Sequence, residues 1–283
     1  MESSSRSVFA LPELLPSNTE DFTRAARLLQ ARAGIVLGPH KRESASRTLS
    51  LRARSVGCAS IAAYLDQLEQ SSASPEWEGF INAFTINHTA FFREQHHFPI
   101  LADFARQRRK PFHVWCCAAS TGEEPYSIAM TLREAGVANA GGQPPVLATD
   151  IDTRALERAE QGVYSLERVQ PVPEAYLKKY FQRGTGGKVG MVRVKPALRS
   201  LVDFQVLNLL SPQWPSERRF DVIFCRNTMI YFDKQTQTRI LERFALLMKP
   251  GGLLFAGHSE NFTYLSNAFR LQGQTVYVVA ERK

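Results

Sequence analysis

The stretch Phe112–Ser127, FHVWCCAASTGEEPYS, decides the fold of this chain. Its apolar run over Val114–Cys117 predicts a buried strand, the small residues over Ala118–Gly122 predict a turn, and Pro125 predicts the start of a helix. A strand, a small-residue turn and a helix start together form the first unit of a nucleotide-binding crossover. The sequence therefore predicts a parallel sheet with a ligand site at this turn.

The charge of this turn indicates what kind of ligand it would bind. A dinucleotide site presents bare backbone N–H groups to a pyrophosphate, whereas this turn is followed by Glu123 and Glu124. Two carboxylates would repel a phosphate and suit a positively charged ligand without one. S-adenosylmethionine (AdoMet), with its sulfonium and amino groups, is such a ligand, which indicates methyl transfer. We expect one of the two to meet the ligand, and Glu123 is the better candidate for an acid that only favours the helix dipole.

Length and composition indicate a globular protein with a large and a small domain. The chain has 283 residues, of which 44% are hydrophobic and 22% charged. No apolar run approaches the roughly 20 residues that span a bilayer, and residues 1–17, expected to be flexible, lack a secretory signal pattern. The four cysteines have no zinc-binding spacing, so we expect free thiols, no metal, a cytoplasmic location and no membrane insertion.

The apolar pattern divides the chain into a helical part and an α/β part. Residues 18–88 are predicted as four helices, over about 18–34, 39–55, 61–70 and 75–87, and residues 89–95 as a linker over the ligand site. In residues 96–283 strands alternate with helices; the strands are predicted at 114–117, 145–150, 220–225, 253–257 and 274–280, and the helices at 125–135, 155–161 and 234–248. This order predicts a doubly wound, mostly parallel, Rossmann-like sheet, with residues 249–252 as a turn.

Residues 163–200 interrupt that alternation. They contain paired prolines, a glycine-rich turn at Gly184–Gly187 and an alternating run at Met191–Lys195. These features predict a small antiparallel β-subdomain inserted into the sheet domain. Insertions of this kind often carry specificity or partner binding.

Polar residues at predicted strand ends are the candidate site residues. Asp150 ends a strand 28 positions after Gly122, where a carboxylate can accept hydrogen bonds from both ribose hydroxyls, although a helix cap is the alternative. Asn227 and Tyr231 follow the strand at 220–225, and each alone is also compatible with ordinary packing. Asn208 and Leu209 are candidates to contact the adenine, although an ordinary strand end is the alternative. Asn87, Thr89 and Arg93, between the helical and the α/β part, are candidates to fold over the ligand, although a plain hinge is the alternative.

The positive charge of the chain suggests an acidic partner. The net charge is +8 and the isoelectric point is near 9.5, which fits a nucleic acid or an acidic protein surface. One predicted helix carries Lys41, Arg42, Arg47, Arg52 and Arg54. Arg47 and Arg54 lie seven residues apart and share a face. This face is either simply solvated or a docking surface for an acidic helix that bears glutamates.

Several stretches together resemble a known family, the bacterial chemotaxis receptor methyltransferases, which are protein-glutamate O-methyltransferases that use AdoMet. The stretches are AGIVLGPHKR (33–42), FINAFTINHTAFFRE (80–94), AASTGEEPYS (118–127), ATDIDTRALERA (148–159), FCRNTMIYFDK (224–234) and the glycine-rich run from Met248 to Phe262. The resemblance covers about residues 20 to 281. It implies a helical receptor-docking domain before a class I methyltransferase domain.

The resemblance also implies residue roles. It places cofactor contacts at Asn87, Thr89, Arg93, Ala118, Glu124, Asp150, Asn208, Leu209, Arg226 and Asn227, and catalytic roles at Arg93 and Tyr231. It implies docking of chemoreceptor cytoplasmic domains on the basic helix, and of their C-terminal pentapeptide on the insert near Gly184 and Gly186. The expected product is S-adenosylhomocysteine, and the protein is expected to be a monomer that binds no nucleic acid.

The implied reaction is one in-line displacement by a glutamate carboxylate. Glutamate has a pKa near 4.3, so it is ionised at neutral pH and no general base is needed. Two other functions stay open. A nucleic-acid methyltransferase would want an Asn/Asp-Pro-Pro-aromatic motif, where this chain has Asn227-Thr-Met-Ile230. The second open function is that of a non-catalytic sensor that binds AdoMet.

Overall fold

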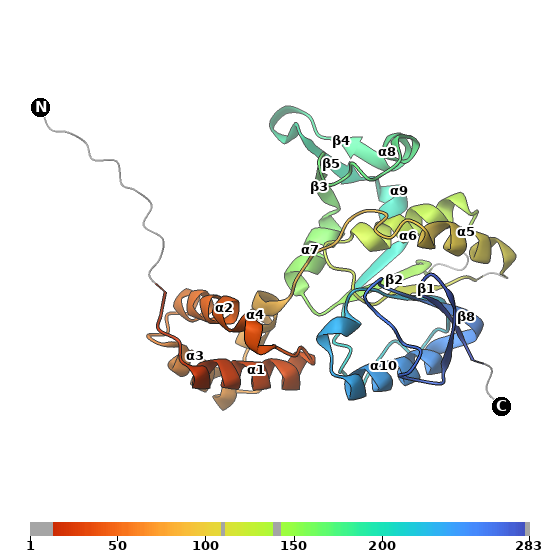
Figure 1. Cartoon of the computed structure of the whole chain (residues 1–283). Helices are drawn as coiled ribbons and strands as arrows, with labels where there is room; N and C mark the ends of the chain where they lie inside the picture. Colours follow the sequence, from red (N-terminus) through yellow and green to blue (C-terminus); the bar gives the residue numbers. More distant parts are fainter. Residues whose placement is uncertain (1–13, 109–110, 138–142, 281–283) are drawn as a thin grey trace, which may run out of the picture. The chain divides into compact units, whose positions relative to one another are not determined.

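The computed structural model describes residues 14–108, 111–137 and 143–280 (Figure 1). Most of the segment expected to be flexible, residues 1–13, lies outside the described residues. The chain forms two compact units. The helical unit is Met1–Gln30 with Leu37–Phe84, and the sheet unit is Ala31–Val36 with Thr85–Lys283.

The helical unit is built from four α-helices and one 3-10 helix among its described residues. They are α1 (Thr19–Ala33), η1 (Pro39–Lys41), α2 (Arg42–Ser55), α3 (Ile61–Gln70) and α4 (Glu76–Phe84). Asn18 and Asp21 exchange side-chain to backbone hydrogen bonds of 2.7 and 3.2 Å, which caps the start of α1. Ser60 accepts from the N–H of Ala63 (3.1 Å) and caps α3. The helix expected to run to residue 87 ends at Phe84, so Asn87 lies in the linker.

The sheet unit contains a seven-stranded sheet in the order β6-β2-β1-β7-β8-β10-β9. Its strands are β1 (Val114–Cys116), β2 (Val146–Asp150), β6 (Val202–Val206), β7 (Phe220–Cys225), β8 (Met248–Ala256), β9 (Phe269–Gly273) and β10 (Val276–Val279). The pairs from β6 to β8 are parallel, and β10 is antiparallel to β8 and to β9. The predicted doubly wound, mostly parallel sheet is confirmed.

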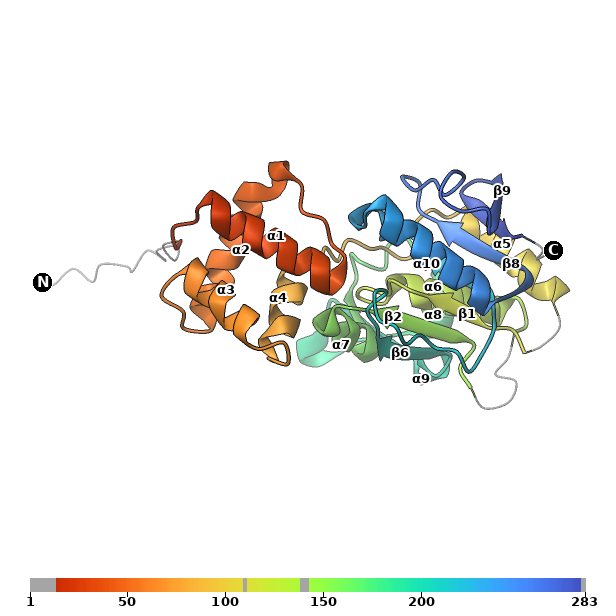
Figure 2. The same ribbon diagram turned by 90° about the horizontal axis from the view of Figure 1, so that it is seen from below.

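Helices cover both faces of this sheet (Figure 2). The face covered by α5 (His97–Gln107), α6 (Glu123–Glu134) and α7 (Thr153–Gln161) shares its core with Cys116. The face covered by α10 (Lys234–Leu247) shares its core with Trp115 and Cys117. Because successive strand residues point to opposite faces, the two neighbouring thiols are separated, as the sequence predicts. The core strands are buried on both faces, which is why they read as continuous apolar runs.

The sequence misplaces one turn and misses two elements of the sheet unit. β8 begins at Met248 and passes through residues 249–252, which were expected to form a turn. A Cβ on Gly252 would lie 2.9 Å from the carbonyl oxygen of Asp221, so a glycine there lets the two backbones approach closely. The strand β9 and the helix α5 were not predicted. Pro99 lies in the first turn of α5, where its missing N–H costs no hydrogen bond.

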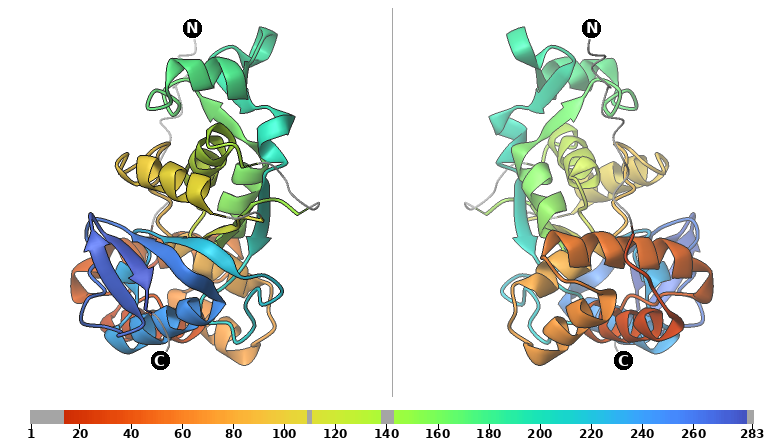
Figure 3. Two further views of the ribbon diagram at one scale, coloured as in Figure 1. Left: turned by 90° about the vertical axis from the view of Figure 1, so that its right-hand side faces the viewer. Right: turned by 90° about the vertical axis from the view of Figure 1, so that its left-hand side faces the viewer.

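The predicted insertion is a separate three-stranded antiparallel sheet in the order β3-β5-β4 (Figure 3). Its elements are β3 (Val163–Ser165), α8 (Glu174–Tyr180), β4 (Phe181–Arg183), η2 (Gly186–Lys188), β5 (Met191–Val194) and α9 (Pro196–Arg199). The linker holds it through Phe91, whose ring lies 4.9 Å from that of Tyr164 and 5.6 Å from that of Phe181, centroid to centroid. Over the described ranges, no helix has the length and apolar content to cross a bilayer.

Candidate functional site

The site lies where the order of the strands reverses, between β1 and β7. In open α/β sheets ligands bind outside the carboxyl ends of the strands at this switch point. Two turns leave the sheet there, Ala118–Gly122 after β1 and Arg226–Asn227 after β7. Asp150 ends the neighbouring strand β2. The structure therefore brings these sequence-predicted residues to one edge.

The turn after β1 has a tightly constrained backbone. Gly122 has a φ of +97°, and a Cβ there would lie 2.7 Å from the hydroxyl of Tyr164. The N–H of Ser120 donates to Asp150 Oδ2 (2.7 Å), and the N–H of Asp152 donates to Asp150 Oδ1 (2.9 Å). Burial raises the pKa of Asp150, and these two N–H groups oppose that rise. The Asp150 carboxylate is thus fixed at the strand end, beside half-buried Ala118.

Asp152 ties the linker to this turn. Its Oδ2 accepts hydrogen bonds from Asn87 Nδ2 (2.7 Å) and Thr85 Oγ1 (2.5 Å), while its Oδ1 accepts from the N–H of Ala155 and caps α7 (3.0 Å). Asn87 Oδ1 in turn accepts from Ser120 Oγ (3.2 Å). The predicted linker over the site therefore has a defined anchor, which the sequence did not reveal.

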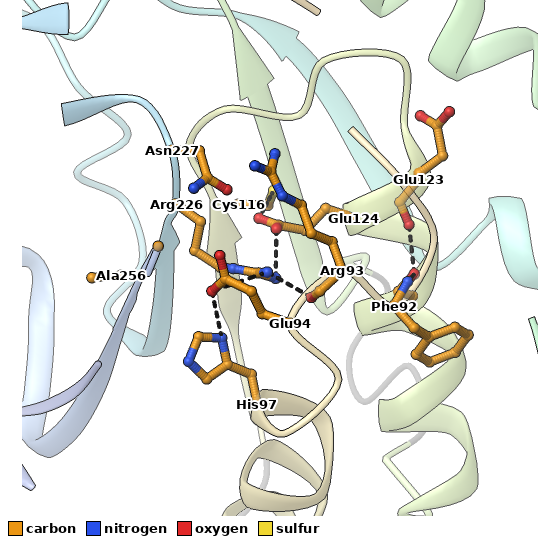
Figure 4. Close-up of polar contacts among 12 residues, drawn as sticks. Phe92, Arg93, Glu94, His97, Cys116, Glu123, Glu124, Arg226, Asn227 and Ala256 are labelled. Atoms are coloured by element: carbon orange, nitrogen blue, oxygen red, sulfur yellow. Dashed lines mark hydrogen bonds and ion pairs between the residues drawn. The ribbon is translucent and has the colours of Figure 1, made fainter. Parts of the chain in front are cut away.

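Three buried charged side chains form the centre of the site (Figure 4). Arg226 Nη1 lies 2.8 Å from Glu124 Oε2, and Arg226 Nη2 lies 3.4 Å from Glu94 Oε2. Arg226 Nη2 also donates to the carbonyl oxygen of Arg93 (2.6 Å). The side chain of Arg226 is 1% exposed, and those of Glu94 and Glu124 are 6% and 9% exposed. One guanidinium is therefore shared by two carboxylates in a place that water barely reaches.

Burial and the charge of Arg226 act in opposite directions on the pKa values of the two carboxylates in this cluster. Burial raises the pKa of Glu124, and Arg226 opposes the rise. Burial also acts to raise the pKa of Glu94, but Arg226 and the N–H of His258 together bring it below its usual value. Burial lowers the pKa of the neighbouring His97 to about 4, so that ring is neutral at pH 7. The two carboxylates share Arg226, and a cationic ligand beside Glu124 would favour its ionised form, which the sulfonium or ammonium of AdoMet can do.

The turn after β7 presents Asn227 and Tyr231. Asn227 is a non-glycine residue with a φ of +56°, and Tyr231 ends the short helix η3 (Met229–Tyr231). Burial raises the pKa of Tyr231, against the opposing charge of Arg93, so the phenol stays protonated at neutral pH. The charge of Arg93 also acts on Glu124, and its side chain extends from the linker toward Asn227 and Glu124 (Figure 4).

Comparison with known proteins identifies the family. Residues 87–278 match the family described as CheR methyltransferase, SAM binding domain, and residues 20–85 match CheR methyltransferase, all-alpha domain. The chain belongs to the CheR methyltransferase family. SAM is AdoMet, so the predicted cofactor is confirmed, as is the resemblance seen in the sequence.

Similar proteins carry the same assignment. The chain is 52% identical over 273 residues to a chemotaxis protein methyltransferase of Klebsiella aerogenes, covering 96% of this chain and 94% of that one. It is 51% identical over 271 residues to a chemotaxis protein methyltransferase of Escherichia coli, with coverage of 96% and 94%. It is 50% identical over 263 residues to chemotaxis protein methyltransferase 2 of Pseudomonas aeruginosa, with coverage of 91% and 92%. This CheR-family protein is an AdoMet-dependent methyltransferase of chemotaxis.

Two predicted adenine contacts have side chains that are used elsewhere. Asn208 Nδ2 donates to the carbonyl oxygen of Arg32 (2.6 Å), and its Oδ1 accepts from the N–H of Leu210 (2.8 Å). The side chain of Leu209 is buried in the core cluster that contains Trp115. Thr89 lies half-buried in the linker.

The predicted docking residues divide into two groups. Lys41, Arg42, Arg47 and Arg54 are exposed, whereas Arg52 forms a two-pronged ion pair with Glu76 in which Nε lies 2.6 Å from Oε1. Arg52 therefore serves the fold of the helical unit, which corrects its predicted role. In the insert, Gly184 lies so close to the carbonyl of Lys188 that no side chain fits, and Gly186 has a φ of +58°.

Glu123 also has a different role from the predicted one. Its side chain is completely buried, and it forms an ion pair with Arg168 from the insert and accepts from Thr121 Oγ1 (2.7 Å). Sequence reasoning likewise missed Glu94 and Asp152, although both lie in quoted motifs. Over the described residues, no group of three His, Cys, Asp or Glu side chains is placed to hold a metal.

Proposed function

We propose that this methyltransferase transfers the methyl group of AdoMet to glutamate carboxylates in the cytoplasmic domains of chemoreceptors, giving glutamate methyl esters. The observation that carries the proposal is the Glu94–Arg226–Glu124 cluster, in which two buried carboxylates share one guanidinium, beside Arg93 and Tyr231. The cluster suits a cationic methyl donor, and Arg93 and the Tyr231 hydroxyl suit an anionic acceptor. The family and the names of the relatives support a chemotaxis substrate.

The reaction needs orientation more than acid–base chemistry. When bound, AdoMet supplies an electrophilic methyl group, and its sulfur departs with the bonding electron pair as the thioether of S-adenosylhomocysteine. A glutamate side chain is already ionised at neutral pH, so no residue of this chain has to remove a proton. Holding the carboxylate in line and excluding water supply the rate enhancement.

Arg93 and Tyr231 are assigned the positioning of the acceptor. Arg93 carries a fixed positive charge, and its Nη1 donates to the carbonyl of His88 (2.9 Å), which ties the side chain to the linker. Because burial raises the pKa of Tyr231, its hydroxyl can donate a hydrogen bond but cannot serve as a base at neutral pH. Both roles are those of a clamp on a carboxylate rather than of an acid or base.

The cofactor is assigned to the residues at the strand ends. Glu124 is matched to the amino group, Asp150 to the ribose hydroxyls, and Asn227 to the amino-acid portion. Asn87, Thr89 and Ala118 line the linker and the first turn, Arg226 holds Glu124, and Asn208 and Leu209 offer backbone groups to the adenine. The contacts that fix Asp150 and Asn87 before any ligand arrives support this assignment.

Receptor docking is assigned to two surfaces. On α2 and the residue before it, the exposed Lys41, Arg42, Arg47 and Arg54 are complementary to a helix that carries glutamates. In the insert, β4 lies at an edge of its sheet, and an extended receptor pentapeptide can add there as a further strand. The compact turn at Gly184 and Gly186 supports close approach to that edge.

Transfer of labelled methyl from AdoMet to receptor-containing membranes tests the proposal. We expect label that base releases as methanol, and we expect Asp150→Ala to abolish it while Asp203→Ala, on the neighbouring strand β6, keeps it. Receptors with and without their last five residues separate helix docking from tethering. If AdoMet binds but no receptor accepts label, the protein is a sensor or has another acceptor. Label on nucleic acid would make it a nucleic-acid methyltransferase.

A further inference from the structure

Glu260, in the segment after β8, is a buried acid that the reaction described above does not use. It is 4% exposed. Its Oε1 accepts hydrogen bonds from the N–H groups of Thr228 (2.9 Å) and Met229 (2.7 Å). Its Oε2 accepts from those of Asn227 (2.8 Å) and Gly257 (2.7 Å). One carboxylate thus binds four backbone donors, three of which are consecutive.

These donors belong to the turn that carries Asn227 and leads to Tyr231. Asn227 has a left-handed backbone with a φ of +56°, a conformation that asparagine adopts more readily than other non-glycine residues. On the other side of the turn, Gln237 Nε2 donates to the carbonyls of Met229 (2.8 Å) and Phe232 (2.9 Å). Glu260 and Gln237 therefore hold the turn by its N–H groups and by its carbonyl groups.

The neighbouring Gly257 completes this arrangement. A Cβ at Gly257 would collide with the side-chain amide of Asn227 and lie 2.9 Å from its backbone nitrogen. The absence of a side chain lets Asn227 lie against the end of β8, while the N–H of Gly257 shares Glu260 Oε2 with Asn227. Glu260 and Gly257 thus both determine the orientation of Asn227.

We propose that Glu260 is a positioning residue, whose carboxylate fixes the Asn227–Met229 backbone so that Asn227 faces the cofactor and Tyr231 faces the acceptor. Converging backbone N–H groups of this kind form an anion-binding nest, and here the anion is supplied by the chain itself. A neutral side chain cannot replace it, because four donors require two oxygens that both only accept. The acceptor part of the proposal rests on the proposed function, whereas the cofactor part rests on AdoMet binding alone.

The test compares Glu260→Gln with Asp221→Asn. Asp221 is a matched buried carboxylate at the amino end of β7, where it accepts from the N–H of His113 (2.8 Å) and from Lys249 Nζ (2.8 Å). Both variants lose stability, so the melting temperature does not distinguish them. We expect Glu260→Gln to raise the AdoMet Kd and lower kcat, with a combined loss in kcat/KM of roughly 100-fold, as for a misplacement of about 1 Å. Asp221→Asn should keep both constants.

Gly257→Ala is the second variant, because Glu260→Gln can fail to fold. It keeps the Glu260 carboxylate and displaces Asn227, so we expect a higher AdoMet Kd, together with a lower melting temperature because the backbone nitrogen of Asn227 must also shift. If Glu260→Gln and Gly257→Ala both bind AdoMet as the unmodified protein does, the proposal is wrong and Glu260 is structural. Since AdoMet binding is measured without an acceptor, failure of the protein to methylate receptors leaves this test intact.

Discussion

The turn after β1 and the turn after β7 face the same site but are held in different ways. The first is fixed by distant elements: Tyr164 donates to the carbonyl of Thr121 (2.8 Å), and Arg168 pairs with Glu123, both from the inserted β-subdomain. The second is fixed by Glu260, which comes from the end of the adjacent strand β8. A change in the insert can therefore reach the first turn directly, while the second turn depends on its own neighbourhood.

Replacing Glu124, next to the first turn, is expected to have the largest effect on AdoMet affinity. Glu124→Gln removes the charge that we propose faces the cofactor and leaves Arg226 with Glu94 as its remaining carboxylate. We expect AdoMet affinity to fall about 10–100-fold, since a hydrogen bond to a charged group contributes about 1.5–3 kcal/mol. Stability should fall by about 3 kcal/mol, the cost of breaking a buried pair. Calorimetric titration and thermal unfolding measure the two effects.

Glu123→Gln is the matched control for that variant. Glu123 is as buried as its neighbour, but its partner Arg168 has a side chain that is 45% exposed. Water compensates that guanidinium when the pair is lost, so we expect a stability loss of only about 1 kcal/mol. Equal loss of AdoMet affinity in the two variants would show that Glu124 acts through the turn rather than on the ligand.

The pH dependence of AdoMet binding gives the next effect. Without ligand, burial raises the pKa of Glu124 above its ordinary value of 4.5, and it raises that of Asp150 above 3.8. A bound cation favours the ionised carboxylate, so binding requires proton release once the pH falls below the raised pKa. Affinity should therefore be constant at high pH and fall as the pH drops, by up to about tenfold per pH unit for each group.

Titration calorimetry in two buffers with different ionisation enthalpies measures that proton release. Proton release should grow as the pH falls toward the raised pKa values of Glu124 and Asp150, and Glu124→Gln should remove the part that Glu124 contributes. Proton uptake instead of release would contradict the assignment of these carboxylates to a cationic ligand.

The sequence alone offers as candidate site residues those that stand at the ends of recognisable strands. Glu124 and Asp150 are among these candidates because an apolar run and a helix start bracket their positions. Glu260 and Arg168 are not, because they act on residues 31–33 and 45 positions away along the chain. Arg52 looked like a free charge for the same reason, since its partner Glu76 is 24 positions away in the next helix but one. Pairing across such distances depends on packing that no local pattern encodes.

Arg168→Ala gives the smallest expected effect and tests whether the insert reaches the first turn. Removing this half-exposed guanidinium leaves Glu123 with Thr121 Oγ1 at 2.7 Å, and the turn keeps its bond from Tyr164. Because the Glu123 carboxylate is fully buried, loss of the guanidinium lowers the stability of the fold, but the bond from Tyr164 keeps the turn in place, so we expect the AdoMet Kd to rise only about two- to fivefold.

Lys179→Ala is the control for Arg168→Ala. Lys179 also joins the insert to α6, at 2.7 Å from Glu134, but at the far end of that helix from the site. We expect it to leave the AdoMet Kd unchanged. If the two variants behave alike, the insert is merely attached to the sheet unit. If only Arg168→Ala weakens AdoMet binding, the insert is coupled to the cofactor site. A ligand that binds the insert and displaces Arg168 should then change the affinity for AdoMet. By linkage, AdoMet should change the affinity for that ligand by the same factor.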